Sequence, residues 1–375
     1  MRIAVNTRLL LKGKMDGIGW FTAETMRRIV ASHPEHTFYF FFDRRPDRDF
    51  IYAKNVVPVV LCPQARHPVL WHMFFEWAVP WAIRHYRIDL YVSPDGMMPL
   101  HPKVPTLTVI HDLNFEHADG NLIPSHQQYM TNRFPRFAKA ATRIATVSEY
   151  SKKDIVETYG VDATKVDVVY DGSNPLYRPH SDEEKSAIRR RFTNGNPYII
   201  FVSTILKRKN LANLLLAFDK VKDMESGPLK LVVVGGRVWW KDELASAYDS
   251  MLHRDDVLLI GRAEPEDLSA LMSAAEALVY PSYFEGFGIP ILEAMYAETA
   301  VICSNTTSMP EVGGDAVMYI DPSSPDDIAH AIRCLSDAGT REALIKKGRE
   351  QREKFSWDRT ANLLWASMMS TVKTR

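Results

Sequence analysis

Three consecutive cationic residues precede a helical pattern in the second half of the chain. Lys207, Arg208 and Lys209 follow the apolar run Tyr198–Ser203. A helix N-terminus carries partial positive charge, so cations are unfavourable there unless an anion binds beside them. Arg offers a planar fork and Lys a point charge, and both suit a diphosphate. The pattern favours a polyphosphate site at Arg208 and Lys209, and the alternative is a solvated loop capped by Asn210.

A second segment combines glycines with two carboxylates. Glu285 precedes Gly286 and Gly288, and Glu293 lies about one turn into the helix that Pro290 opens. Pro suits a first helical turn, and glycine lets the backbone approach a ligand closely. Carboxylates accept hydrogen bonds from the vicinal hydroxyls of a sugar or a ribose. The segment therefore predicts a sugar or nucleoside site, although two Glu residues at this spacing could also be coincidental.

The first half of the chain carries two weaker signals. Gly17 and Gly19 follow the first strand pattern and open a helix, where anions are favoured. Thr22 replaces the third glycine of a dinucleotide fingerprint, so a plain tight turn is preferred over a nicotinamide site. His111 directly follows the apolar run Thr106–Ile110. It could orient a donor or stabilise charge, and the alternative is a structural histidine bonded to a loop carbonyl.

Other chemistries are disfavoured. The chain has 46 basic and 46 acidic residues, so broad nucleic-acid binding is not expected. Cys62, Cys303 and Cys334 lie far apart and show neither zinc nor disulfide spacing. No P-loop motif is present. The D-x-D triplet Asp47–Asp49 could hold Mg²⁺ against a diphosphate, but its charged surroundings favour a solvated turn. We therefore expect neither a metal nor a cofactor.

Strand and helix patterns alternate along all 375 residues, which predicts an α/β fold of parallel sheets covered by helices on both faces. The predicted strands are Ile3–Asn6, Thr37–Phe42, Val56–Leu61, Leu90–Val92, Thr106–Ile110, Ile144–Val147, Val166–Val169, Tyr198–Ser203, Lys230–Val234, Val257–Ile260, Ala277–Tyr280 and Ala300–Cys303. The predicted helices are Gly19–Ser32, Val69–His85, Ser125–Ala141, Glu149–Tyr159, Asp182–Phe192, Leu211–Lys222, Lys241–Leu252, Pro265–Ala274, Pro290–Ala297 and Trp357–Thr371.

The pattern restarts after the polar, proline-containing segment 174–179. We expect two Rossmann-like doubly wound domains, 1–178 and 179–356, facing each other across a cleft, with helix 357–371 packing back on the first.

No apolar run is long enough to span a membrane, and the N-terminus lacks the features of a signal peptide. The most apolar segment, 70–83, contains several aromatic residues and is interrupted by Glu76 and Pro80. It predicts a buried or half-buried helix, and the alternative is a peripheral contact with a bilayer. We expect a cytoplasmic protein, with possible attachment to the inner face of the plasma membrane left open.

Taken together, these motifs resemble the family 4 retaining glycosyltransferases with the GT-B fold. The resemblance spans nearly the whole chain and is strongest in the second half. Its motifs are an E-x7-E signature at Glu285 and Glu293, an R-K-N element at 208–210, a strand and loop at 303–311 continued at 314–316, the glycine loop 17–19, an H-D-L segment at 111–113, a strand-to-helix turn at 146–149, and Asp171-Gly172 in place of a hinge N-G.

The resemblance implies a role for each matching residue. Arg208 and Lys209 would hold the diphosphate of a nucleotide-sugar and stabilise the leaving nucleotide, so Lys209→Ala would abolish transfer with the fold intact. Glu293 would bond the ribose, and Glu285 with the N–H groups of 286–288 would hold the sugar. The donor-binding residues would be Gly17, Gly19, Ser203, Thr204, Gly286, Phe287, Gly288, Ile289 and Glu293, with His111, Glu285, Arg208 and Lys209 in catalytic roles. Many members carry Gly-Arg where this chain has Ser203-Thr204.

The implied activity is metal-independent, retaining transfer of a hexose to a glycan or lipid-linked acceptor in cell-surface polysaccharide synthesis. GDP-mannose is the first choice of donor because R-K-N members often look like mannosyltransferases, with UDP- and dTDP-sugars left open. A GT-B epimerase and a non-catalytic binding scaffold are the competing functions. The sequence leaves open the acceptor, the linkage and the oligomeric state.

Overall fold

The computed structural model describes the chain except residues 118–122, 226, 237–238 and 375. It divides into two compact units. Unit 1 comprises Met1–Asp171 with Trp357–Arg375, and unit 2 comprises Gly172–Ser356. The chain thus leaves unit 1 at Asp171, where the sequence pattern suggested residue 178.

Unit 1 is built on a 7-stranded sheet of parallel pairs, in the order β3-β2-β1-β4-β5-β6-β7. Its strands are β1 (Arg2–Asn6), β2 (Thr37–Phe42), β3 (Val56–Val60), β4 (Leu90–Ser93), β5 (Thr106–Val109), β6 (Arg143–Thr146) and β7 (Val166–Val168). The chain runs from β1 outwards to β3 and then crosses to β4 on the other side of β1. Ligands bind outside the carboxyl ends of strands at such a reversal, so residues that follow β1 and β4 are of particular interest.

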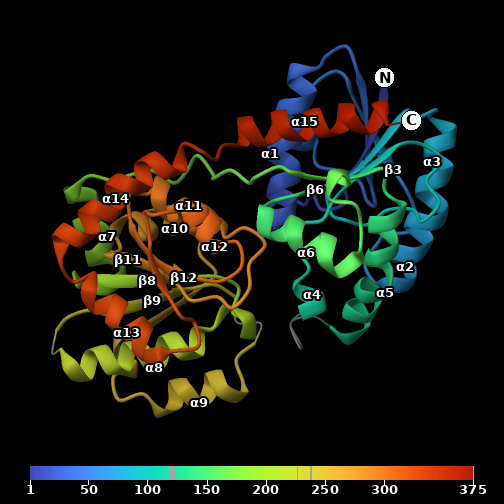
Figure 1. Cartoon of the computed structure of the whole chain (residues 1–375). Coiled ribbons are helices and arrows are strands. Elements are labelled where there is room, and N and C mark those ends of the chain that lie inside the picture. Colours follow the sequence, from blue (N-terminus) through green and yellow to red (C-terminus); the bar gives the residue numbers. More distant parts are fainter. Residues whose placement is uncertain (118–122, 226, 237–238, 375) are drawn as a thin grey trace. The chain divides into compact units, whose positions relative to one another are not determined.

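Helices cover both faces of this sheet (Figure 1). They are α1 (Gly17–Ser32), α2 (Pro68–Met73), the π-helical turn η2 (Phe74–Ala78), α3 (Val79–His85), α4 (Asn114–His117), α5 (Pro124–Ala140), α6 (Glu149–Tyr159) and α15 (Trp357–Lys373), with 3₁₀ turns η1 (Arg48–Phe50) and η3 (Ala163–Lys165). The apolar sides of α2, α3, α5 and α6 share one buried cluster. On the other face α15 lies beside α1, so the C-terminal helix belongs to unit 1.

Unit 2 repeats the plan with a 6-stranded sheet of parallel pairs, in the order β10-β9-β8-β11-β12-β13. Its strands are β8 (Tyr198–Val202), β9 (Lys230–Val234), β10 (Val257–Gly261), β11 (Ala277–Tyr280), β12 (Ala300–Ser304) and β13 (Met318–Ile320). Here the reversal lies between β8 and β11. The residues of β8 and β11 are buried throughout, as expected of strands covered on both faces.

The helices of unit 2 are α7 (Asp182–Thr193), α8 (Leu211–Met224), α9 (Asp242–Ser250), α10 (Pro265–Ala274), α11 (Ile289–Tyr296), α12 (Met309–Gly313), α13 (Pro325–Cys334) and α14 (Ala338–Arg352), with 3₁₀ turns η4 (Lys207–Lys209) and η5 (Arg254–Asp256). Helices α8, α9 and α13 lie on one face and α7, α10, α11 and α14 on the other (Figure 1). Local signals fix several ends. Ser181 and Glu184 form a capping box at the start of α7, for example.

Candidate active site

A buried ion pair lies at the reversal between β8 and β11. Lys209, at the end of η4, is 8% exposed, and Glu285, just after β11, is 6% exposed. The Lys209 Nζ lies 2.5 Å from Glu285 Oε1 and 2.9 Å from the Tyr280 hydroxyl, which itself donates to Glu285 Oε1 at 2.8 Å. The chain leaves this turn through Asn210, whose left-handed backbone (φ 58°) is held by hydrogen bonds from its side chain to two carbonyls.

Arg208 joins the same carboxylate from the other side. Its Nη1 donates to Glu285 Oε2 at 3.1 Å and to the Phe284 carbonyl at 2.8 Å. Burial alone would raise the pKa of Glu285, but the charges of Lys209 and then Arg208 outweigh it and lower that pKa to about 2. Two cations and one carboxylate leave this cluster with one net positive charge. A partly buried positive cluster at the carboxyl end of parallel strands is suited to binding an anion.

The glycine segment forms a tight turn from Glu285 into α11. Gly288 has φ 102°, which favours glycine, and Pro290 stands in the first helical turn. Ser308, after β12, holds the turn, because its hydroxyl lies 2.9 Å from both the Glu285 and the Phe287 carbonyl oxygens. Phe287 is buried and packs edge-on against Phe355 at 5.5 Å. The turn is therefore rigidly supported beneath the backbone that the sequence predicted as a sugar site.

Glu293 lies on α11 about a turn beyond Ile289. Its side chain is half-buried and hydrogen-bonded to Tyr177. Burial raises the pKa of Glu293 to about 7, against a smaller lowering by that hydrogen bond. This carboxyl therefore titrates near neutral pH, unlike Glu285.

Ser203 and Thr204 form the loop after β8, with Ser203 half-buried and Thr204 exposed. The Ser203 backbone lies directly against Gly235 at the end of β9. A Cβ on Gly235 would stand 1.7 Å from the Ser203 carbonyl oxygen. Gly235 thus permits the close approach of two loops at the carboxyl edge of the sheet.

The first-half candidates gather at the corresponding edge of unit 1. Gly17 is exposed and begins α1, and Gly19 N–H donates to the helix-capping Asp16 carboxylate at 2.9 Å. A Cβ on Gly19 would stand 3.0 Å from the Leu9 carbonyl oxygen, so this glycine also has a packing role. His111 follows β5, with its Nε2 2.8 Å from the Pro94 carbonyl oxygen and its ring edge-on to Phe21. The loop-carbonyl contact foreseen as an alternative is therefore present.

Sequence reasoning missed several residues that support the site. Tyr280 was named from the sequence only as the last residue of a predicted strand. In the structure its hydroxyl contacts both Lys209 and Glu285. Thr307 accepts the Glu285 N–H at 3.2 Å, and Tyr177 bonds Glu293. Tyr280 could have been found, because the last residue of a central parallel strand points to the ligand edge. The partners of Thr307 and Tyr177 depend on tertiary packing.

Asp47 and Asp49 lie in the 3₁₀ turn region around η1 and both pair with Lys12, at 3.4 and 2.6 Å. Within the described residues, no three or more His, Cys, Asp or Glu side chains are grouped so that they could hold a metal ion.

The aromatic segment forms one continuous helical run, α2-η2-α3. Trp71 and Phe74 are 7% and 0% exposed, so these two rings of the segment are part of the core and cannot contact a bilayer. Trp77 and Trp81 are instead 63% and 51% exposed, and they line an apolar groove of about 450 Å³ beside β3. Among the described helices, none has both the length and the apolar character needed to cross a bilayer.

Comparison with known proteins identifies the family of both halves. A family model described as glycosyl transferases group 1 matches residues 182–351, and one described as Glycosyltransferase Family 4 matches residues 15–175.

Two curated relatives resemble most of the chain. The O-antigen chain mannosyltransferase B of Escherichia coli is 29% identical over 361 residues, 93% of this chain and 94% of that protein. The O-antigen chain mannosyltransferase RfbU of Salmonella typhimurium is 28% identical over 288 residues, 75% of this chain and 76% of that protein.

A solved structure has the same fold as this chain. Anabaena HepE, determined in complex with UDP-glucose, superposes with a TM-score of 0.74 at 16% identity, covering 99% of this chain and 100% of HepE. Two parallel-sheet α/β units, two matching family models and full-length structural similarity agree. The chain therefore belongs to the group 1 and family 4 glycosyltransferases and has their GT-B fold.

Proposed function

We propose that this glycosyltransferase is a retaining, metal-independent mannosyltransferase. It moves mannose from a nucleotide-diphosphate sugar, with GDP-mannose as first choice, to a glycan or lipid-linked acceptor in cell-surface polysaccharide synthesis. The names of the two curated relatives described above support mannose and O-antigen synthesis. The observation that carries the mechanism is the buried cluster of Lys209, Arg208 and Glu285 at the β8–β11 reversal.

The cluster provides what a leaving diphosphate requires. Breaking the bond from the sugar to the phosphate develops negative charge on the departing oxygen. Arg208 and Lys209 stabilise that charge, and their attraction is strengthened because both side chains are largely screened from water. Glu285 holds the two cations in place before the donor binds. In this proposal no divalent ion is needed to balance the diphosphate.

The neighbouring residues orient the rest of the donor. The backbone N–H groups of Gly286 to Gly288, on a turn fixed by Ser308, and the Glu285 carboxylate bind the sugar. Glu293 accepts hydrogen bonds from the ribose hydroxyls. Ser203 and Thr204 lie on the adjacent loop, where the main chain reaches the phosphates.

Retention follows from attack on the same face from which the phosphate leaves. The bond between the anomeric carbon and the phosphate oxygen breaks, and a bond to the acceptor oxygen forms. The acceptor hydroxyl proton passes to the leaving phosphate oxygen, so the protein itself needs to supply no base.

The direct test is incubation of the purified chain with GDP-mannose and a mannose-terminated acceptor, followed by NMR of the product. We expect a new mannoside with the α configuration of the donor. A β-mannoside would overturn retention. A new nucleotide-sugar formed without acceptor would identify an epimerase instead.

Metal independence is tested in the same assay after treatment with EDTA. We expect the rate to persist. Strict dependence on added Mg²⁺ would contradict the proposal and direct attention to Asp47 and Asp49, with Asp47→Asn and Asp49→Asn as the decisive variants.

The nucleotide is tested by thermal shift, because a ligand that binds the native state raises its apparent stability. We expect GDP to raise the melting temperature more than UDP or dTDP at equal concentration. A larger response to UDP would instead indicate a UDP-sugar donor, the class of nucleotide-sugar with which HepE was solved.

A peripheral membrane contact forms a further part of the proposal. Trp77 and Trp81 lie one helical turn apart, and such exposed aromatic rings favour the interface of a bilayer. We expect the chain to float with anionic lipid vesicles and Trp77→Ser with Trp81→Ser to abolish flotation. Trp20→Ser, at an exposed position on α1, is the matched control. Flotation unchanged in the double variant would reject this surface.

A further inference from the structure

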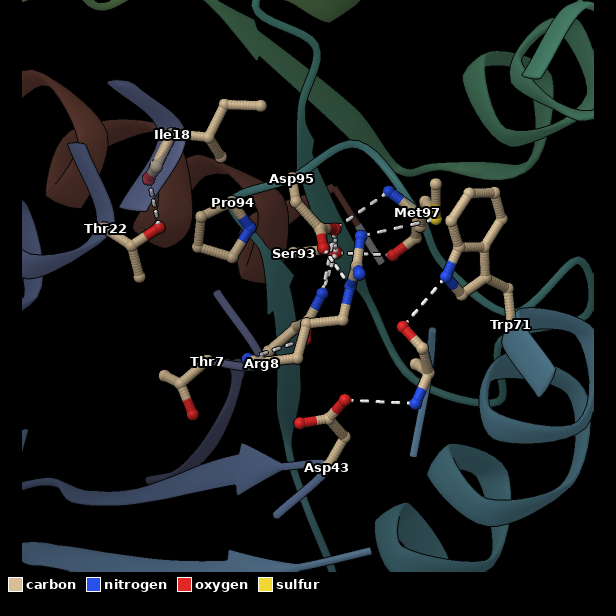
Figure 2. A network of polar contacts seen from close by, with 12 residues as sticks. Thr7, Arg8, Ile18, Thr22, Asp43, Trp71, Ser93, Pro94, Asp95 and Met97 are labelled. Atoms are coloured by element: carbon tan, nitrogen blue, oxygen red, sulfur yellow. Dashed lines mark hydrogen bonds and ion pairs between the residues drawn. The ribbon is translucent and has the colours of Figure 1, made fainter. Parts of the chain in front are cut away.

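A second buried ion pair occupies the reversal of the other sheet. Arg8 follows β1 and Asp95 follows β4, and their side chains are only 10% and 4% exposed. Figure 2 shows the contact between Arg8 Nε and Asp95 Oδ2, at 2.6 Å. The other carboxylate oxygen accepts the Asn6 amide at 2.8 Å and the Met97 N–H at 3.1 Å. The Asp95 carboxylate is thereby fixed from three directions.

The turn that carries Asp95 is held by hydrogen bonds and by close packing. The Ser93 hydroxyl lies 3.0 Å from Asp95 Oδ1 and 2.5 Å from the Met97 carbonyl oxygen, so it spans the turn. Gly96 has φ 81°, and a Cβ there would stand 2.7 Å from the ring of Phe134. Only glycine fits this position, and the turn is clamped between the sheet and α5.

The clamped turn presents one carbonyl to His111. The Pro94 carbonyl oxygen lies 2.8 Å from His111 Nε2. A carbonyl oxygen only accepts hydrogen bonds, so Nε2 must carry a proton. Burial lowers the pKa of His111, against smaller raising by the Pro94 bond and then the charges of Asp112, Asp16 and Asp95. In the neutral ring, Nδ1 is then an acceptor. Among the described residues it has no hydrogen-bond partner.

The arrangement matches that of the candidate donor site in unit 2. There a cation after β8 pairs with a carboxylate after β11 at 2.5 Å, and Ser308 after the next strand holds the carboxylate's own turn. In unit 1 a cation after β1 pairs with a carboxylate after β4, and His111 after β5 contacts the carboxylate's own turn. Both pairs lie where each strand order reverses.

We propose that Asp95 and Asn6 are positioning residues for the transfer reaction. They fix the Pro94 carbonyl, which binds His111 Nε2–H, so that His111 offers Nδ1 as a hydrogen-bond acceptor to a sugar hydroxyl at the carboxyl edge of the unit 1 sheet. The inference rests on the proposed function for its sugar ligand. The tautomer and its dependence on Asp95 stand without it.

The tautomer is tested by ¹⁵N NMR of histidine-labelled protein. We expect His111 to be neutral at pH 7.5, protonated at Nε2 and unprotonated at Nδ1. In Asp95→Asn and in the milder Asn6→Ala, the Nε2 proton should exchange faster and its signal should shift. Asp43→Asn is the matched control (Figure 2), because Asp43 is also a buried, ion-paired carboxylate that follows a strand of the same sheet, β2. It is bonded to Arg44 and to the Ala65 N–H and not to the Pro94 turn.

The kinetic arm uses the mannosyl-transfer assay. Loss of positioning is expected to lower kcat on the order of tenfold to a hundredfold in Asp95→Asn, with little change in the KM for the donor and normal activity in Asp43→Asn. His111→Asn, which retains an acceptor near the place of Nδ1, should keep more activity than His111→Phe.

The inference is overturned if His111 is protonated at Nδ1, or if Asp43→Asn shifts its signals as much as Asp95→Asn. Unfolding of Asp95→Asn would leave Asn6→Ala to decide. If the wild-type chain transfers no mannose, the proposed function fails and the NMR result still decides whether the network positions His111.

Discussion

Lys209 has a structural role in the buried cluster and, in the proposed function, a chemical role, and the two can be separated. It is buried and paired with Glu285, so it is more than a loop cation. Breaking a buried pair on one side costs about 3–5 kcal/mol because the remaining charge is left uncompensated, and Arg208 reduces that cost here. We expect Lys209→Ala to lose transfer and also to lower the free energy of unfolding by about 3 kcal/mol. Urea denaturation measures the second effect.

The double variant Lys209→Met with Glu285→Gln separates the roles. It removes both charges of the pair at similar volume, but Arg208 then loses its contact with the Glu285 carboxylate. Part of the lost stability should therefore return while transfer remains absent. A double variant that transfers at the wild-type rate would show that the pair serves the fold alone.

Glu293 should make donor binding depend on pH. Its pKa of about 7 lies above the usual value of a carboxyl, so it is protonated at pH 6 and ionised at pH 8. Only the ionised form accepts hydrogen bonds from both ribose hydroxyls. A group of pKa 7 is about one-tenth ionised at pH 6, so affinity should fall about tenfold from pH 8 to pH 6.

Calorimetric titration with GDP-mannose measures this dependence, because its diphosphate is esterified at both ends and does not titrate in that range. Glu285 also stays ionised there, since its pKa is about 2. Glu293→Gln should bind more weakly and without the pH slope. A slope that survives in this variant would assign the titration to another group.

At the scale of elements, the loop after β8 depends on a neighbouring strand. Gly235→Ala would place a Cβ 1.7 Å from the Ser203 carbonyl oxygen, and a backbone atom cannot simply rotate away. We expect this variant to melt well below wild type, by about 2–4 °C for each kcal/mol of strain in a unit of this size, and to bind GDP-mannose weakly.

Gly261→Ala is the control for that prediction. Gly261 also has a positive φ, 78°, and a Cβ there meets nothing within 4 Å. An alanine at position 261 therefore introduces backbone strain but no clash of its Cβ with a neighbouring atom. Equal melting temperatures for the two variants would mean that the Ser203 loop moves freely.

Strong local signals explain why most elements could be predicted. Strand β2 is a continuous aromatic run and α6 lies between an N-capping Ser148 and a left-handed Gly160, and both match their predicted bounds. Strand β13 was missed, and α12 to α14 were not assigned. The predicted helix 69–85 is present but contains the π turn η2, a feature that residue periodicity does not reveal.

The site was predictable where residue types were unusual and unpredictable where partners come from distant strands. Arg208, Lys209 and Glu285 were named from cation and carboxylate patterns, and the structure brings them together. Arg8 and Asp95 were not, because a single Arg and a single Asp 87 residues apart carry no local signal. Only the parallel order of β1 and β4 makes them neighbours.

At the scale of the molecule, two sheets of similar plan place a buried cation–carboxylate pair at each strand reversal. The candidate donor site and the His111 network therefore share one structural arrangement, built from different residues. No sequence repeat accompanies it, which indicates that the constraint is geometric. Residues after the central strands of a doubly wound sheet are the ones that converge.

The C-terminal helix α15 completes unit 1 and packs against a residue that contacts His111. Trp357 packs edge-on against Phe21, the residue whose ring contacts His111. Thr360 donates to the Tyr170 carbonyl at 2.5 Å, and Ser367 donates to Asp167 at 2.6 Å. Leu364 is fully buried. Helix α15 thus completes the core of a unit from which it is separated by all of unit 2 in sequence.

A chain ending at Ser356 should consequently lose unit 1 while keeping unit 2. Burial of each large apolar side chain contributes about 1.5–3 kcal/mol, so removing Trp357, Leu364 and Met368 costs a large share of the roughly 5–15 kcal/mol that stabilises a domain. We expect calorimetry to lose the unit 1 transition, mannosyl transfer to disappear, and GDP still to raise the melting temperature of unit 2. A chain ending at Thr371, the last buried residue of α15, is the control and should keep both transitions. Loss of the GDP response together with unit 1 would contradict the assignment of nucleotide binding to unit 2 alone.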